Sequence, residues 1–187
     1  PQGQRCAQAI AAQSEKLQAL MEALVKSSRL ETGILALHPE PGPLSPTVER
    51  AVAQYLSKAQ AKQIRLSVGQ MRGSALFDPK WTEEALCNLL DNAVKYTPAG
   101  GRVSVEIRPY EMFTAVCVQD TGPGIPEAEQ AKIFGRFYRA PSAYQTEGVG
   151  IGLYLTRQIA AGQGGYIKVE SSPGAGSIFS LYLPRES

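Results

Sequence analysis

The sequence holds a single histidine and three cysteines, and this scarcity argues against several kinds of site. Cys6, Cys87 and Cys117 lack the spacing of metal ligands, so we interpret them as small core or surface residues in a reducing compartment. His38 stands in a proline-rich stretch with no Cys, His or carboxylate pattern around it. The sequence therefore predicts neither a zinc site nor a histidine-based catalytic triad.

Strong net charge and long apolar runs are also missing. The 187 residues carry a net charge of +2, and 43% of them are hydrophobic. We find no basic patch typical of nucleic-acid binding, no signal peptide and no apolar run long enough to cross a bilayer. We therefore expect a cytoplasmic piece of protein that contacts neither nucleic acid nor membrane, with one domain of ordinary size and an appendage.

The appendage is a predicted helix from about Cys6 to Glu31, a stretch without Pro or Gly. Ile10, Leu17 and Leu24 recur at seven-residue intervals in a strip wide enough for a helical bundle. Dimerisation would cover this strip, and a peripheral helix folded back on its own domain is the other interpretation. Residues 34–46 are rich in proline and predict a stiff, extended linker.

After the linker, helical and strand patterns are mixed. Helices are predicted over 47–61, 79–97 and 152–161, and strands over 64–68, 75–77, 102–108, 114–119, 166–170 and 177–183. Short links between the later strands predict two antiparallel hairpins. This mixture predicts an α+β fold, with one sheet covered by helices on one face.

The helix that follows Asp78 and Pro79 has an apolar strip and a polar row. The apolar positions recur at three- and four-residue steps: Leu86, Leu89, Leu90, Ala93 and Val94. The polar row consists of Glu84, Asn88, Asn92 and Lys95. Carboxamides four residues apart lie one above the other on a helix, so two amide oxygens can converge on one point. This suits a hard cation with phosphates, and the alternative is an ordinary solvated helix face.

Two glycine-containing motifs follow. Asp120-Thr-Gly-Pro-Gly124 leaves the end of a strand, so its carboxylate could accept from an exocyclic amine such as that of adenine. Gly148, Gly150 and Gly152 alternate with other residues and lead into a helix, which exposes backbone amides to phosphate oxygens. The sequence matches neither the dinucleotide fingerprint nor the P-loop.

A third motif, Ile133-Phe-Gly-Arg-Phe-Tyr-Arg139, lies between the two glycine motifs in an irregular segment. Phe134 and Phe137 could pin a mobile lid, which would leave Arg136 and Arg139 to reach charged oxygens. Each of the three motifs is common by itself, so their order along the chain is the more specific signal.

That order, closed by Gly174-x-Gly176, resembles the ATP-binding module of bacterial sensor histidine kinases, in the superfamily of gyrase-type ATPases, heat-shock chaperones and mismatch-repair ATPases. The likeness covers about Leu44 to Pro184, and Ser27 to Gly33 resembles the end of the second dimerisation helix. It implies a two-layer α/β sandwich with a mixed, mostly antiparallel sheet covered by helices on one face. Residues 1–33 would be the dimerisation helix, 34–46 the linker and 47–187 the ATP-binding domain.

The resemblance also implies a site for ATP and Mg²⁺. Asn92 would bind Mg²⁺ with support from Asn88, Lys95 would meet the phosphates, and Arg139 would steady the γ-phosphate. Asp120 would bind the adenine amine. The other expected nucleotide contacts are Tyr96, Gly122, Gly124, Ile125, Phe134, Phe137, Gly148, Val149, Gly150, Ile151, Gly152 and Leu153.

The implied reaction transfers the γ-phosphate to a histidine, for relay to the aspartate of a response regulator receiver domain. The resemblance also implies a homodimer through the N-terminal helix in the full-length protein, and whether that protein is membrane-anchored is left open. In the family, the acceptor histidine lies on the first helix of the dimerisation domain. This sequence has no such segment, and its single histidine, His38, is in the wrong place, so we expect a fragment. A regulatory module that binds nucleotide without transfer is an alternative. An ATPase is less favoured, because hydrolytic relatives have a glutamate where this chain has Asn88, and an amide cannot activate water.

Overall fold

The first of two compact units in the chain is essentially one helix. In the computed structural model, which describes residues 2–31, 36–140 and 148–185, the units divide after Ala36. Helix α1 (Gln2–Glu31) forms as predicted, and Ile10, Leu17, Met21 and Val25 of its apolar strip are exposed. Within the described ranges, no helix combines the length and apolar character needed to cross a bilayer.

The second unit is built on a five-stranded sheet with the strand order β2-β4-β5-β7-β6. The strands are β2 (Arg65–Val68), β4 (Arg102–Pro109), β5 (Phe113–Asp120), β6 (Tyr166–Ser172) and β7 (Gly176–Pro184). β2 pairs with β4 in parallel, and every other neighbouring pair is antiparallel, including both predicted hairpins. The sheet is therefore mixed and mostly antiparallel.

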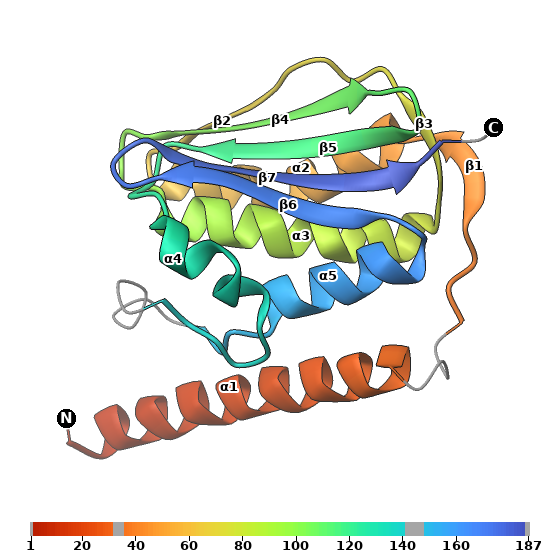
Figure 1. The fold of residues 1–187 in the computed structure, drawn as a ribbon. Helices are drawn as coiled ribbons and strands as arrows, with labels where there is room; N and C mark the ends of the chain where they lie inside the picture. The colour runs from red at the N-terminus through yellow and green to blue at the C-terminus, as the bar shows by residue number, and fades with distance from the viewer. Residues whose placement is uncertain (1, 32–35, 141–147, 186–187) are drawn as a thin grey trace. The chain divides into compact units, whose positions relative to one another are not determined.

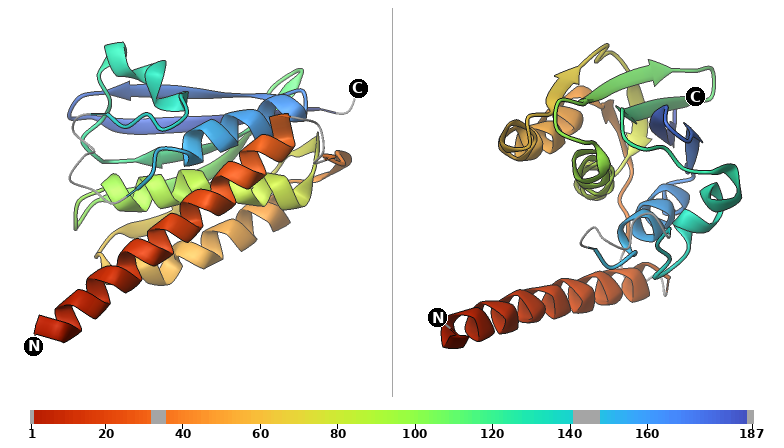
Figure 2. Two further views of the ribbon diagram at one scale, coloured as in Figure 1. Left: turned by 90° about the horizontal axis from the view of Figure 1, so that it is seen from below. Right: turned by 90° about the vertical axis from the view of Figure 1, so that its left-hand side faces the viewer.

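Three helices, α2 (Ser45–Ala61), α3 (Pro79–Tyr96) and α5 (Gly152–Gly162), cover one face of this sheet (Figures 1 and 2). The core lies between the two layers, because alternate residues of β4 and the apolar strip of α3 are buried there. Val103, Val105 and Ile107 are at most 1% exposed. Each fully buried leucine of α3 contributes about 1.5–3 kcal/mol to folding. The predicted α+β sandwich is confirmed.

The proline-rich stretch differs from the linker that we expected. Glu40–Pro43 forms strand β1, which pairs antiparallel with β3 (Ser74–Phe77) in a separate two-stranded sheet, and it belongs to the second unit. An edge strand tolerates proline because only one of its sides needs backbone donors. Leu44, directly after β1, is fully buried and donates its N–H to Gly73. The domain therefore begins before residue 47, while residues 34 and 35 lie outside the described part.

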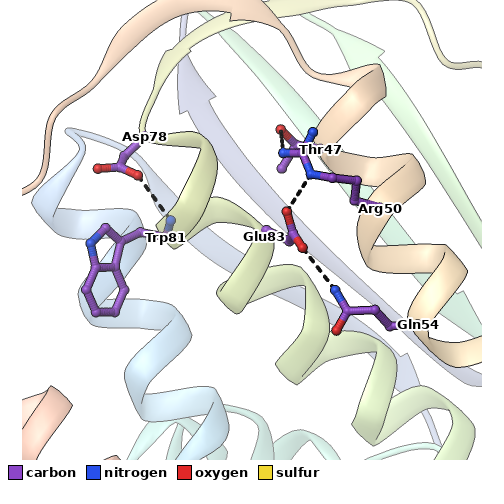
Figure 3. Close-up of polar contacts among 6 residues, drawn as sticks. All are labelled: Thr47, Arg50, Gln54, Asp78, Trp81 and Glu83. Carbon is purple, nitrogen blue, oxygen red and sulfur yellow. Dashed lines mark hydrogen bonds and ion pairs between the residues drawn. The ribbon is translucent and has the colours of Figure 1, made fainter.

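The start of α3 is fixed by its capping residue, as the sequence predicts. Asp78 accepts a hydrogen bond from the backbone N–H of Trp81 at 3.1 Å (Figure 3), and it also accepts from the N–H of His38 at 2.9 Å. Pro79 occupies the first helical turn, where its missing N–H costs nothing. The side chain of Gln163, at the end of α5, accepts from the N–H of Asp78 at 2.5 Å.

Helix α3 is also tied to α2 along its length. Glu83 accepts from Arg50 at 2.7 Å and from Gln54 at 2.9 Å (Figure 3). Lys62, just after α2, donates to the carbonyl oxygens of Val94 and Lys95 at 2.9 and 2.6 Å, where a cation also complements the negative end of the helix dipole. These contacts hold α3 at both ends, so the direction of its polar row is fixed.

Candidate functional site

The polar row of α3 is partly covered rather than solvated. Glu84, Asn88, Asn92 and Lys95 are all half-buried. The start of α5 lies over Asn88, because a methyl group added to Gly152 would sit 3.5 Å from the Asn88 Oδ1 atom. Among the described side chains, Asn88 is one of two with a buried polar atom, here Nδ2, that has no hydrogen-bond partner. A buried donor of this kind is suited to a ligand oxygen or a water.

The alternating glycines bring backbone close to this row. A Cβ atom on Gly148 would lie 2.5 Å from the Lys95 Nζ atom, and one on Gly150 would lie 2.6 Å from the Tyr138 carbonyl oxygen. Gly150 also has a φ of +78°, which favours glycine. Between and after the glycines, Ile151 is buried, and Val149 and Leu153 are half-buried. The glycine segment therefore lies against Lys95 and Asn88 of α3 at its two ends, and at Gly150 a side chain would overlap the backbone of Tyr138.

Two cationic residues gather at the end of α3. The Lys95 Nζ atom lies 5.5 Å from the centre of the Tyr96 ring. Burial raises the pKa of Tyr96, and the positive charge of Arg139 opposes this rise, so the guanidinium acts on the phenol electrostatically. A Cβ atom on Gly150 would lie 3.1 Å from Arg139 Cγ. Lys95 and Arg139 thus make this end of the site favourable for negative charge.

Asp120 ends strand β5 and supplies a buried carboxylate, only 6% exposed. Its Oδ1 atom accepts from the N–H of Gly122 at 2.7 Å, and the backbone N–H of Ser177, the register partner of Asp120 in β7, acts to lower the pKa of the carboxyl. A Cβ atom on Gly122 would be 3.2 Å from the Tyr96 carbonyl oxygen, so this loop adjoins the end of α3. Burial raises the pKa of Asp120 above its usual range, although the two backbone donors counteract this effect.

This shift predicts how nucleotide binding depends on pH. If the ionised carboxylate accepts from the adenine amine, ATP affinity should fall as the pH drops through the raised pKa of Asp120, about 10-fold once the group is protonated. The folded state binds this proton more readily than the unfolded state, so protonation itself stabilises the domain and unfolding does not explain the loss. Calorimetric titrations at several pH values test this.

Purine riboside triphosphate, which lacks the 6-amino group, is the control ligand for this prediction. Its affinity should change much less with Asp120 protonation, while protonation of the triphosphate affects both ligands equally. Identical pH profiles for the two nucleotides would contradict the assignment of Asp120.

The aromatic motif has one buried and one exposed member. Phe134, in the short 3-10 helix η1 (Lys132–Phe134), is buried and packs edge-on against Phe179, with ring centres 6.4 Å apart. Phe137 is 49% exposed with a φ of +61°, and its predicted contact with a lid stays a prediction. Arg136 stacks 4.9 Å from the ring centre of Tyr154 and donates to its hydroxyl. Residues 141–147 of the predicted lid lie outside the described part.

The predicted site residues thus come from four segments that meet at one end of the sheet. Figure 1 shows that α4 (Glu127–Gln130) and the start of α5 lie where β5 and α3 end. Amide, cationic and carboxylate groups face glycine-rich backbone there, as a phosphorylated ligand with an amino-bearing base requires. Fold and site together define a nucleotide-binding α/β sandwich.

Comparisons with known proteins identify this class more closely. Residues 77–187 match the family described as histidine kinase-, DNA gyrase B- and HSP90-like ATPase. The adaptive-response sensory kinase SasA of Synechococcus sp. (strain JA-3-3Ab) is 37% identical over 175 residues, which cover 92% of this chain and 46% of SasA. The chain thus spans about half the length of this relative.

Two solved structures share the fold. The mycobacterial sensor histidine kinase MprB is 27% identical with a TM-score of 0.68, over 80% of this chain and 99% of that one. Full-length ShkA, solved in complex with AMPPNP, is 24% identical with a TM-score of 0.83, over 98% of this chain and 39% of that one. The chain belongs to the histidine kinase-, DNA gyrase B- and HSP90-like ATPase family. Within it, residues 77–187 belong to the ATP-binding catalytic domain of a sensor histidine kinase, which confirms the resemblance.

Proposed function

We propose that this chain binds Mg-ATP and transfers the γ-phosphate to a histidine, for relay to the aspartate of a response regulator receiver domain. The observation that carries this proposal is the contact between the polar row of α3 and the glycines before α5. Asn88 faces Gly152 there and Lys95 faces Gly148. A triphosphate between these segments would meet backbone amides on one side and amide and ammonium groups on the other.

The residues of α3 fit a magnesium ion chemically. Mg²⁺ prefers oxygen ligands and retains water, so the amide oxygen of Asn92, supported by Asn88, suits it together with phosphate oxygens. Bound Mg²⁺ would offset charge on the transferred phosphoryl group. Within the described ranges, no cluster of three or more His, Cys, Asp or Glu side chains forms an all-protein metal site.

The remaining residues act by positioning and charge. Lys95 holds the phosphates, Arg139 stabilises the charge of the γ-phosphoryl group, and the Asp120 carboxylate accepts from the adenine amine. Phosphoryl transfer needs little covalent help from a protein beyond alignment of the two reactants and neutralisation of charge. ShkA, which has this fold, was solved in complex with AMPPNP, and this supports nucleotide binding by the present chain.

The proposed acceptor histidine and the proposed partners lie outside the ATP-binding domain. His38, whose backbone N–H donates to Asp78 at the start of α3, lies at the other end of that helix from Lys95, so we assign the acceptor role to a histidine of a separate dimerisation helix. The exposed strip of α1 supports a homodimer formed through residues 1–33, with residues from about 37 onward as the ATP-binding domain. We place this domain in the cytoplasm, where ATP and response regulators are available.

Hydrolysis of ATP by water is the less favoured activity. A general base must take a proton from the attacking water, and the Asn88 amide at the corresponding place on α3 cannot do so. No such chemical argument speaks against a module that only binds nucleotide to regulate a partner. An experiment must therefore distinguish this activity from phosphoryl transfer.

Transfer of a labelled phosphate tests the proposed function. The chain is incubated with Mg²⁺, ATP labelled at the γ-phosphate, and a separate polypeptide that contains the dimerisation helix with its acceptor histidine. We expect acid-labile label on that polypeptide and none when its histidine is replaced by glutamine. ATP binding without transfer would favour the regulatory module, and release of inorganic phosphate without an acceptor would favour the ATPase.

A further inference from the structure

The loop after Asp120 is held against the hairpin of β6 and β7. Gly124, with a φ of +72°, lies so close to β6 that a Cβ atom would overlap the Ser172 carbonyl oxygen. The N–H of Gly174, in the hairpin turn, donates to the Pro123 carbonyl oxygen at 2.7 Å. The wall of the site that contains Asp120 therefore depends on a turn about 50 residues later in the sequence.

Ser171, near the end of β6, is the centre of a hydrogen-bond network behind this wall. Its Oγ atom accepts from the N–H of Ile125 at 2.8 Å and donates to the Gly176 carbonyl oxygen at 2.8 Å. The Ser177 hydroxyl lies 2.9 Å from the same atom. A serine has one hydroxyl proton, which is directed to Gly176, so the Ser177 hydroxyl is the donor to Ser171.

This network reaches Asp120 through a single residue. Ser177 donates its hydroxyl to Ser171 and is the register partner of Asp120 in the antiparallel pairing of β5 and β7. The position of Asp120, whose carboxylate also accepts from Gly122 in the same loop as Ile125, is therefore linked through Ser177 and Ser171 to the position of Ile125.

Gln130, in α4, reinforces the same junction. Its Nε2 atom donates to the Ile125 carbonyl oxygen at 3.0 Å and to the Ser171 carbonyl oxygen at 2.8 Å. Both hydrogens of this amide group are thus used to join the loop to β6. Ile125 is held at its N–H by Ser171 and at its carbonyl by Gln130.

We propose that Ser171 is a positioning residue for nucleobase recognition, with Gln130 as a second clamp on the same loop. The inference rests on the proposed function, in which Asp120 accepts from the adenine amine. Loss of the Ser171 hydroxyl leaves the Ile125 N–H and the Ser177 hydroxyl without their acceptor. The loop and the carboxylate then lose the alignment that favours a purine with an amine at position 6.

Calorimetric binding of two nucleotides to the full chain measures this alignment. The ligands are Mg-ATP and the magnesium complex of purine riboside triphosphate. The ratio, defined as the dissociation constant of the analogue divided by that of ATP, measures how much the amine contributes to binding. For S171A we expect about 10-fold weaker ATP binding, the typical cost of one lost hydrogen bond, here that between the adenine amine and a misaligned Asp120 carboxylate, with much less change for the analogue. S171T, which keeps the hydroxyl, should restore the ratio.

Two further variants complete the test. Ser67→Ala, at an exposed site on β2, is the matched control and should keep the wild-type ratio. Gln130→Met keeps the side-chain length and removes both donors, so it should lower the ratio in the same direction as S171A, even if S171A fails to fold.

An unchanged ratio in S171A and Gln130→Met, whether the binding of both nucleotides weakens equally or does not weaken at all, would overturn this inference alone. This holds provided that the wild type discriminates between the ligands. A wild-type chain that binds neither nucleotide would instead overturn the proposed function.

Discussion

Replacement of Asn92 by alanine is expected to reduce phosphoryl transfer by about 10³-fold. Metal-assisted charge stabilisation supplies several kcal/mol, and about 4 kcal/mol corresponds to this factor. Alanine removes the amide oxygen that we assign to Mg²⁺ and leaves the rest of the polar row in place. The measurement is single-turnover transfer of labelled phosphate to the separate acceptor helix at saturating ATP.

The fold should survive this substitution. Asn92 is half-buried at the surface of α3, and alanine is a better helix former, so the unfolding free energy should change by less than about 1 kcal/mol. Gln60→Ala is the control, since it removes an exposed carboxamide from α2 and should leave transfer unchanged. A wild-type transfer rate for the Asn92 variant would remove Asn92 from the proposed magnesium site.

The helices and the sheet could be predicted because their patterns are local. The apolar steps from Leu86 to Val94 identify the buried side of α3, and Asp78 with Pro79 identifies its start. The alternation in β4 and the short link to β5 identify an antiparallel hairpin. In each case one energetic term, burial or capping, dominates over a few neighbouring residues.

Strand β1 could not be predicted, since its stability depends on pairing with β3, more than 30 residues away. Proline argued correctly against helix and central strand, but sequence patterns do not indicate an available sheet edge. Phe134 and Phe137 illustrate the same limit, because the motif does not indicate that the first ring is buried and the second about half exposed.

The residues expected to contact the nucleotide could be predicted from the sequence, but the residues that hold them in position could not. The polar row and the glycines carry recognisable residue types at fixed spacings, and the resemblance supplied their roles, which stay predictions. Ser171 and Gln130 were not singled out, because a serine at a strand end and a glutamine in a short helix are common. Their contacts with Ile125 arise only from tertiary folding.

The largest expected loss of stability comes from Gly176→Ala. Gly176 has a φ of +82°, and an added Cβ atom would overlap the carbonyl oxygen of Asp120 on the neighbouring strand. Left-handed backbone costs a residue with a side chain about 1–2 kcal/mol, and overpacking against rigid backbone adds about 1–3 kcal/mol. We therefore expect a loss of about 3–4 kcal/mol in unfolding free energy, together with weaker ATP binding because β7 adjoins Asp120.

Gly174→Ala separates the two contributions. Gly174 has nearly the same φ, +81°, but a Cβ atom there would meet nothing within 4 Å, so only the cost of about 1–2 kcal/mol for left-handed backbone applies. Urea unfolding followed by the fluorescence of Trp81, the sole tryptophan and a buried one, measures both variants in the second unit. Equal losses for the two variants would mean that β7 shifts to accommodate the methyl group. The close approach of Gly176 to Asp120 would then not restrict this position to glycine, and conformational freedom alone would account for both residues.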